Sequence, residues 1–334
     1  MTMQRLPEFE LKRAASLAEA AAWLGADPRA RLLAGGTDLV PNLRRGIDGA
    51  PVLVDLGGVR SLCDITVTDA GLTLGAGVTL ARLALDAAVA QHYPALSEAA
   101  RAVAGPGHRS VATVAGNLCQ DTRCIYYNQS AWWRAANDHC LKLGGSVCHV
   151  APQGRRCHAA FSGDLAPALL VLGAQVELVS VRGARRLPLT ELYRDDGAAH
   201  LTLAHDEVLA SVHVPLAAPA MRCGYRKART RAAMDFALAG VACALTLQGG
   251  VISALQLAIT GTNANPFVLA DCEDFAGRRV DAELLALLGK RVQKQVSPMR
   301  STATPSNHRR LVAAALAQRL VLELAGTPTP APTR

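Results

Sequence analysis

The stretch from Leu118 to Phe161 constrains this chain most, because it carries many cysteines and few side chains that could form a core. Four cysteines stand in it at steps of 16, 8 and 9 residues: Cys124, Cys140, Cys148 and Cys157. Between residues 121 and 160 only five side chains are branched aliphatics. A long excursion without structure of its own is uncommon in a compact domain. The stretch therefore predicts a clamp, which four thiolates provide when they bind a metal centre.

Three kinds of clamp are compatible with these cysteines. Disulfides are disfavoured, because the nine cysteines are an odd number and the first residues lack the apolar segment of a secretion signal. We therefore expect a reducing, cytoplasmic location, where such cysteines serve metal or redox chemistry.

Zinc and an iron–sulfur cluster both remain open. Structural zinc sites pair ligands across two to four residues, and the four cysteines contain no such pair. Cys119 and Cys124 have a suitable gap, however, and three histidines of the stretch could add nitrogen ligands: His139, His149 and His158. A cluster held by four thiolates tolerates wider spacing. Unligated, buried thiols suit the scattered cysteines better: Cys63, Cys223, Cys243 and Cys272.

Length and charge narrow the function classes. A chain of 334 residues suggests two domains. The net charge is +8, but the arginines are spread along the chain and aromatic residues make up only 4%, so we do not expect nucleic-acid binding. An anionic cofactor or an acidic protein partner accounts for the charge equally well. No apolar run reaches the roughly 18 residues that a membrane span needs.

The hydrophobic pattern predicts alternating helices and strands. The expected elements are a helix over 13–26 with a Ser16–Glu19 capping box, a strand over 51–56, short strands over 62–80, helical segments over 81–104, a helix then a strand over 163–180, a domain boundary near 215–219, antiparallel strands over 224–263, and helices over 280–292 and 308–325.

Two glycine-rich loops lie in the first half of the chain. One is Gly35-Gly36-Thr37-Asp38, and the other spans residues 105–119. Glycines let the backbone turn tightly and direct N–H groups at an anion. One such loop is a weak signal, but two predict a phosphate-bearing cofactor.

Four motifs resemble the FAD-binding subunit of the molybdenum hydroxylase (xanthine dehydrogenase) family. They are AGGTDL at 34–39, ATVAGN at 112–117, GDLAPALLVLGA at 163–174, and the pattern of Lys227, Arg231 and Asp235. The cysteine stretch resembles an insert in one branch of that family, the β subunit of 4-hydroxybenzoyl-CoA reductase. In that branch the insert carries a [4Fe–4S] cluster.

The resemblance implies an α+β fold of two domains. Residues 1–217 would form a two-lobed FAD-binding domain of the PCMH/vanillyl-alcohol-oxidase type, with the iron–sulfur insert at about 119–160. Residues 218–325 would form a smaller α+β domain with a three-stranded antiparallel sheet, like the C-terminal domain of the CO dehydrogenase flavoprotein. Residues 326–334, rich in Pro and Thr, would be a disordered tail.

The resemblance also assigns cofactor residues. The FAD pyrophosphate would be wrapped by backbone amides of the first loop: Leu32, Leu33, Ala34, Gly35, Gly36, Thr37, Asp38 and Leu39. The second phosphate and ribityl loop would be Thr113, Ala115, Gly116 and Asn117, where Ala115 replaces a glycine that is frequent in the family. Asp164 would approach the ribityl or ring side and Lys227 the flavin ring. The cluster ligands would be Cys124, Cys140, Cys148 and Cys157, and the chain would contain no catalytic residue.

The implied function is electron transfer. The chain would work beside a molybdopterin-binding large subunit and a [2Fe–2S] small subunit, as a dimer of heterotrimers, with ferredoxin as the electron donor. The complex would reductively remove the hydroxyl of 4-hydroxybenzoyl-CoA to give benzoyl-CoA. One alternative is the FAD subunit of an oxidising hydroxylase that acts on xanthine, an aldehyde or CO. A further alternative is an interaction module that is stapled by zinc.

Overall fold

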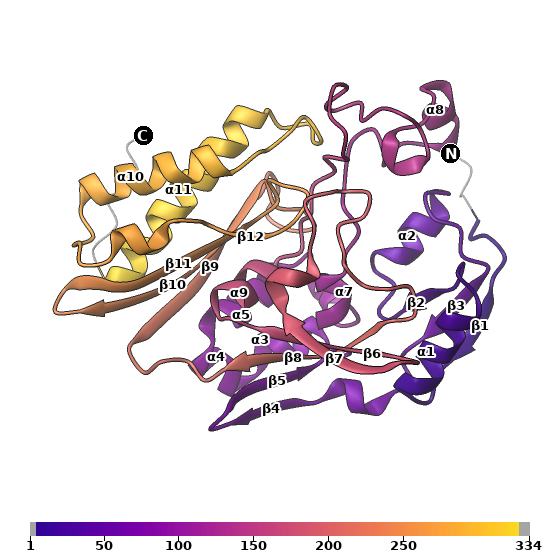
Figure 1. Ribbon diagram of the computed structural model, residues 1–334, viewed down its shortest axis with the longest axis horizontal. Coiled ribbons are helices and arrows are strands. Elements are labelled where there is room, and N and C mark those ends of the chain that lie inside the picture. The colour runs from indigo at the N-terminus through magenta and orange to yellow at the C-terminus, as the bar shows by residue number, and fades with distance from the viewer. Residues whose placement is uncertain (1–4, 327–334) are drawn as a thin grey trace.

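The chain builds three β-sheets with helices packed against them, as described by a computed structural model over residues 5–326 (Figure 1). The first sheet is parallel, in the order β1-β3-β2, and is accompanied by two helices. Its elements are β1 (Glu10–Arg13), α1 (Leu17–Ala26), β2 (Arg31–Leu33), α2 (Leu39–Arg44) and β3 (Val52–Asp55). The expected N-cap is confirmed, because Ser16 Oγ accepts from the Glu19 amide. Glu19 Oε2 accepts from the Ala15 amide, one residue before the partner that a capping box uses.

The second sheet is antiparallel, in the order β4-β5-β8-β6-β7. Its strands are β4 (Ile65–Thr68), β5 (Gly71–Gly75), β6 (Gln175–Ser180), β7 (Gly183–Pro188) and β8 (Val208–Pro215). The helices between them are α3 (Leu80–Leu85), α4 (Ala87–His92), α5 (Pro94–Ala102), α6 (Pro106–Arg109), α7 (Val114–Leu118) and α9 (Leu165–Val171). One continuous hydrophobic core joins this sheet, its helices and α1 of the first lobe.

The third sheet is antiparallel, in the order β12-β11-β10-β9, and two long helices cover it (Figure 1). Its elements are β9 (Met221–Ala228), β10 (Ala239–Gln248), β11 (Val251–Thr260), β12 (Phe267–Val268), α10 (Ala282–Gln295) and α11 (Ser306–Ala325). The expected three strands are thus four. The fourth strand, β12, pairs through only two residues, which is too short to give a periodic signal in the sequence.

The cysteine insert leaves the first domain between α7 and α9 and projects beside α2 (Figure 1). Its neck is closed by Arg123 and Ala160, which exchange two backbone hydrogen bonds of 2.8 Å. Inside it lie only α8 (Ala131–Ala136) and the 3₁₀ turn η2 (Leu141–Leu143). The prediction of a segment with little core is confirmed. Its hydrophobic cluster contains few buried residues, two of them cysteines: Ile47, Cys124, Tyr127, Cys157 and Ala159.

The remaining short elements are 3₁₀ turns: η1 (Arg60–Cys63), η3 (Leu189–Leu192) and η4 (Cys272–Phe275). Within residues 5–326, no helix is both long and apolar enough to cross a membrane. Residues 327–334 of the expected disordered tail lie outside the described residues.

Candidate cofactor sites

The turn between β2 and α2 has the geometry of an anion-binding loop. Gly36 takes a left-handed conformation with φ of 67°, which glycine adopts without strain. Gly35 lies so close to the second loop that a Cβ there would overlap the carbonyl oxygen of Val111. Among residues 5–326, no backbone carbonyl accepts from the amides of residues 35–38. These N–H groups are therefore available to a phosphate.

The second glycine-rich loop is held mainly by bonds within the protein. Thr113 caps α7, where its hydroxyl accepts from the Gly116 amide at 3.1 Å. The Ala115 amide donates to Ala76 O at 3.0 Å, so that donor is already used. Asn117 Oδ1 accepts from the Leu165 amide at 2.9 Å and ties this loop to α9. The loop therefore offers a rigid, close-fitting wall rather than a row of free amides.

A buried ion pair joins the two domains at the end of this loop. Lys227 Nζ on β9 lies 2.9 Å from Asp164 Oδ2 at the start of α9, and each side chain is only 4% exposed. Tyr225 completes the group by donating its hydroxyl to Asp164 Oδ1 at 2.6 Å. Burial raises the pKa of Asp164, while the Lys227 ammonium and the Tyr225 hydroxyl oppose that rise. Such a group holds the Lys227 ammonium in a fixed position.

The structure brings several of the residues expected to bind FAD into pairwise contacts with their neighbours. Gly35 touches Val111, Asn117 holds Leu165, and the neighbouring Asp164 pairs with Lys227. Leu32 and Leu33 differ from the rest of the first loop, because they form strand β2 beside β3. The other members of the lysine motif lie apart: Arg231 and Asp235 form an exposed ion pair of 3.2 Å.

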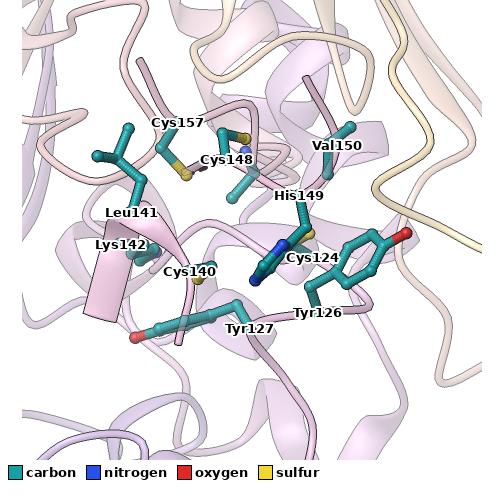
Figure 2. Close-up of a pocket in the computed structure, with 11 residues that line it drawn as sticks. Cys124, Tyr126, Tyr127, Cys140, Leu141, Lys142, Cys148, His149, Val150 and Cys157 are labelled. Atoms are coloured by element: carbon teal, nitrogen blue, oxygen red, sulfur yellow. Dashed lines mark hydrogen bonds between the residues drawn. The ribbon is translucent and has the colours of Figure 1, made fainter. Parts of the chain in front are cut away.

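The four cysteines of the insert line one cavity, and Figure 2 shows their sulfur atoms facing the same space. The cavity is small in this structure, with room for about one water molecule. Cys124, Cys148 and Cys157 are buried and Cys140 is half-buried. Thiols 33 residues apart in sequence therefore share one site, as the spacing alone could not show. Cys119 does not line the cavity, and burial raises its pKa to about 12.

The cavity also contains a cation. Lys142 lines it with a side chain that is 6% exposed and lies over the Tyr127 ring at 4.2 Å. Its ammonium donates to Asp121 Oδ1 at 2.6 Å and to Thr122 Oγ1 at 2.5 Å. Burial raises the pKa of Cys157 to about 12, and Lys142 acts in the opposite direction. The site thus has a positive charge in place beside groups that become anions when they bind metal.

The arrangement of the thiols bears on the kind of metal centre. All nine cysteines lie within the described residues and all are free thiols, so no disulfide clamps the insert. Over residues 5–326, no group of three or more His, Cys, Asp or Glu side chains is placed to hold a metal ion. Around one zinc ion each sulfur would lie about 2.3 Å from the metal. The four thiols line one cavity, but the structure does not place them as the ligands of a bound ion.

Sequence reasoning missed three residues of these sites. Tyr225 had a signal, because it precedes Lys227 by two positions on a strand and so shares its face. Lys142 and Arg123 had no pattern in the sequence that would have indicated their roles. Arg123 reaches the first glycine loop, where it forms an ion pair with Asp38.

Comparisons with known proteins agree with this architecture, in which a domain with two glycine-rich loops is followed by a domain built on the third sheet. Residues 7–217 match the family described as FAD binding domain in molybdopterin dehydrogenase. Residues 224–324 match the CO dehydrogenase flavoprotein C-terminal domain. The chain is 30% identical to the xanthine dehydrogenase FAD-binding subunit of Escherichia coli O157:H7, with 86% of each chain covered. It is 35% identical to the aldehyde oxidoreductase FAD-binding subunit PaoB of Escherichia coli K12, covering 72% of this chain and 78% of that one.

Solved structures share the fold. Reconstituted CO dehydrogenase from Oligotropha carboxidovorans matches with a TM-score of 0.80 at 22% identity, covering 97% of this chain and all of that one. Quinoline 2-oxidoreductase from Pseudomonas putida 86 matches with a TM-score of 0.77 at 25% identity, covering 96% of this chain and 98% of that one.

Fold and loops together define a FAD-binding flavoprotein subunit of an oxidoreductase, and the expected α+β fold class is confirmed. More particularly, the chain belongs to the FAD-binding medium subunits of the xanthine dehydrogenase and CO dehydrogenase family, the molybdenum hydroxylases.

Proposed function

We propose that this chain transfers electrons within a molybdenum hydroxylase complex through FAD and a second, metal centre held by Cys124, Cys140, Cys148 and Cys157. The observation that carries the proposal is the cavity lined by all four thiols next to the flavin-type loops. Bound FAD exchanges electrons singly or in pairs. The chain's own residues would hold it, with the amides of 35–38 toward the pyrophosphate and the Asp164–Lys227 pair toward the ring side.

The metal centre that suits the insert is a [4Fe–4S] cluster. Four cysteine thiolates are its usual ligands. The cavity offers four thiols and a fixed ammonium at Lys142. We exclude Cys119 from the ligand set because it does not line this cavity.

We further propose the domain division and the partners that the sequence suggests. Residues 1–217 would be the FAD-binding domain with its insert, and residues 218–325 the C-terminal domain. The partners would be a molybdopterin-binding large subunit and a [2Fe–2S] small subunit, as a dimer of heterotrimers. Support comes from relatives that are named subunits, such as the glyceraldehyde dehydrogenase medium chain of Sulfolobus acidocaldarius. The substrate would be bound by the large subunit.

The reaction class that the comparisons favour is oxidation, because the similar proteins are named xanthine dehydrogenase, aldehyde oxidoreductase and CO dehydrogenase. The second candidate is reductive dehydroxylation of 4-hydroxybenzoyl-CoA with ferredoxin as donor. One observation favours it, the four-cysteine insert, since a low-potential iron–sulfur centre suits a difficult reduction.

The test is composition and absorption of the full chain purified without oxygen. We expect one FAD, four iron and four sulfide per chain, with flavin bands on a broad iron–sulfur absorption. Cys148→Ser should lose the iron and keep FAD, whereas Cys119→Ser should keep both. Zinc in place of iron, or flavin alone in iron-replete cells, would refute the metal centre.

The reaction class is tested on the assembled complex. Reduced ferredoxin or viologen with 4-hydroxybenzoyl-CoA measures the reductase, and an electron acceptor with xanthine or an aldehyde measures the oxidase. Turnover in only one assay decides between the two candidates.

A further inference from the structure

A chain of hydrogen bonds and ion pairs connects the cysteine cavity with the first glycine loop. It begins at Lys142, which lines the cavity and donates to Asp121 at 2.6 Å. The backbone amide of Asp121 donates to Asp38 Oδ2 at 2.9 Å. Asp38 also forms an ion pair with Arg123, which stands directly before the first cavity cysteine, Cys124. The two candidate cofactor sites are therefore in contact through named side chains.

Asp38 is a poor neighbour for a phosphate unless its charge is compensated. Its backbone amide is one of the free amides at residues 35–38, and the same residue carries a carboxylate, so a negative charge stands within one residue of the expected anion. Like charges at close range repel, and more strongly where burial reduces solvent screening. In residues 5–326 the basic side chain in an ion pair with Asp38 is Arg123, and this pair is largely withdrawn from solvent, at 24% and 15% exposed. Arg123 thus removes an obstacle to anion binding.

The position of Arg123 depends in turn on the insert. Its backbone forms the neck with Ala160, and its guanidinium donates to Asn42 Oδ1 on α2 at 2.6 Å. Beyond the neck, the hydrophobic cluster that packs the insert is small and includes Cys124 and Cys157. A metal centre that binds these thiols would hold both arms of the loop together, and with them the segment that carries Arg123.

We propose that Arg123 is a positioning residue that couples the two centres, so that loading of the cysteine site strengthens FAD binding. By linkage, FAD must then strengthen retention of the metal by the same factor. This inference rests on the proposed function, because it presumes FAD and a metal centre. Beyond that function, the flavin site is complete only when the insert is ordered and holds Arg123 in place.

The experiment measures FAD dissociation constants by flavin fluorescence for the full chain, first with its iron–sulfur centre reconstituted and then after removal by a chelator. We expect at least tenfold weaker FAD binding in the metal-free parent. In Arg123→Met, FAD should bind weakly in both forms. In Asp38→Asn, which removes the uncompensated charge, the two forms should agree within about threefold. Arg155→Met is the matched control: it removes an exposed arginine of the same insert and should keep the parent's tenfold dependence.

The outcomes separate the two proposals. A chain that takes up no iron refutes the metal centre and the coupling together. A chain that binds four iron but has equal FAD affinity with and without them refutes the coupling alone. If Arg123→Met does not fold, judged by circular dichroism, Asp38→Asn decides: a tenfold metal dependence that persists in that variant also refutes the coupling.

Discussion

The two glycine loops and the cysteine insert hold their sites in opposite ways. The second loop is fixed by backbone bonds to its own domain, Leu80 N to Ala112 O at 2.9 Å and Val114 N to Val78 O at 2.9 Å, and the first loop packs against it at Gly35. The insert is fastened mostly by side chains: Arg123 to α2, Arg134 to Gly46 O at 2.7 Å. The backbone of such a loop is set before its ligand arrives, although the charge of Asp38 is compensated from the insert by Arg123. A site built from side chains on a small core instead gains order from the ligand.

The largest expected effect is in the first loop. Gly35→Ala places a methyl group against the Val111 carbonyl, and backbone on both sides must move. We expect a loss of about 4 kcal/mol in unfolding free energy and of FAD binding. Urea unfolding measures the first and FAD content the second. Gly107→Ala, where the added methyl meets open space, is the control and should change stability by less than about 0.5 kcal/mol. If Gly35→Ala changed the unfolding free energy as little as Gly107→Ala, the two loops would not be closely packed at Gly35.

A pH dependence is expected where the insert meets its domain. Burial, helped by Lys142, lowers the pKa of His200 to about 4. The unfolded chain takes up a proton there below about pH 6.5, and the folded chain does not until about pH 4. Unfolding free energy should therefore fall as pH drops through this window, by about 3 kcal/mol in total.

His200→Gln should remove that part of the acid sensitivity, measured as the difference from the parent in urea unfolding between pH 7 and pH 4.5. The exposed His92→Gln should retain it. If both variants follow the parent, His200 does not titrate as its burial indicates.

Removing the metal should affect the insert and spare the loops. With FAD saturating, chelation should raise tryptic cleavage after the exposed Arg155 about tenfold, equivalent to about 1.4 kcal/mol of local opening. Cleavage after Arg109, in the second glycine loop, should change less than twofold. Mass spectrometry of the fragments gives both rates. Equal acceleration at the two sites would mean that the regions open together and the contrast is wrong.

The smallest effect is a glycine in the insert. Gly144 has φ of 84° but nothing lies within 4 Å of an added Cβ. Gly144→Ala should therefore cost only its backbone strain, about 1 kcal/mol. Urea unfolding of this variant beside Gly35→Ala compares a strained turn with a crowded one. If Gly144→Ala lowered the unfolding free energy as much as Gly35→Ala, the insert would be packed as tightly as the loops.

Local chemistry explains what the sequence could predict. Gly35-Gly36 predicts a turn by itself. Short-range patterns likewise predict the helix cap at Ser16 and the paired strands of the C-terminal domain. The four cysteines predict that the insert is held together by a bound group, but their spacing cannot show that the thiols share a cavity. Pairings across long loops are also invisible: Asp38 and Arg123 are 85 residues apart. The two-residue β12 is too short for any period to register.

The helix α8 has a practical consequence. Of the chain's three tryptophans, Trp132 and Trp133 both stand on it, and the Trp133 ring lies 6.0 Å from Tyr126, which lines the cysteine cavity. A strongly absorbing group in the cavity would quench their emission, while Trp23 in α1 supplies a reference signal from the first lobe. The insert thus carries its own optical reporter, and its filling and emptying can be followed in real time without a label.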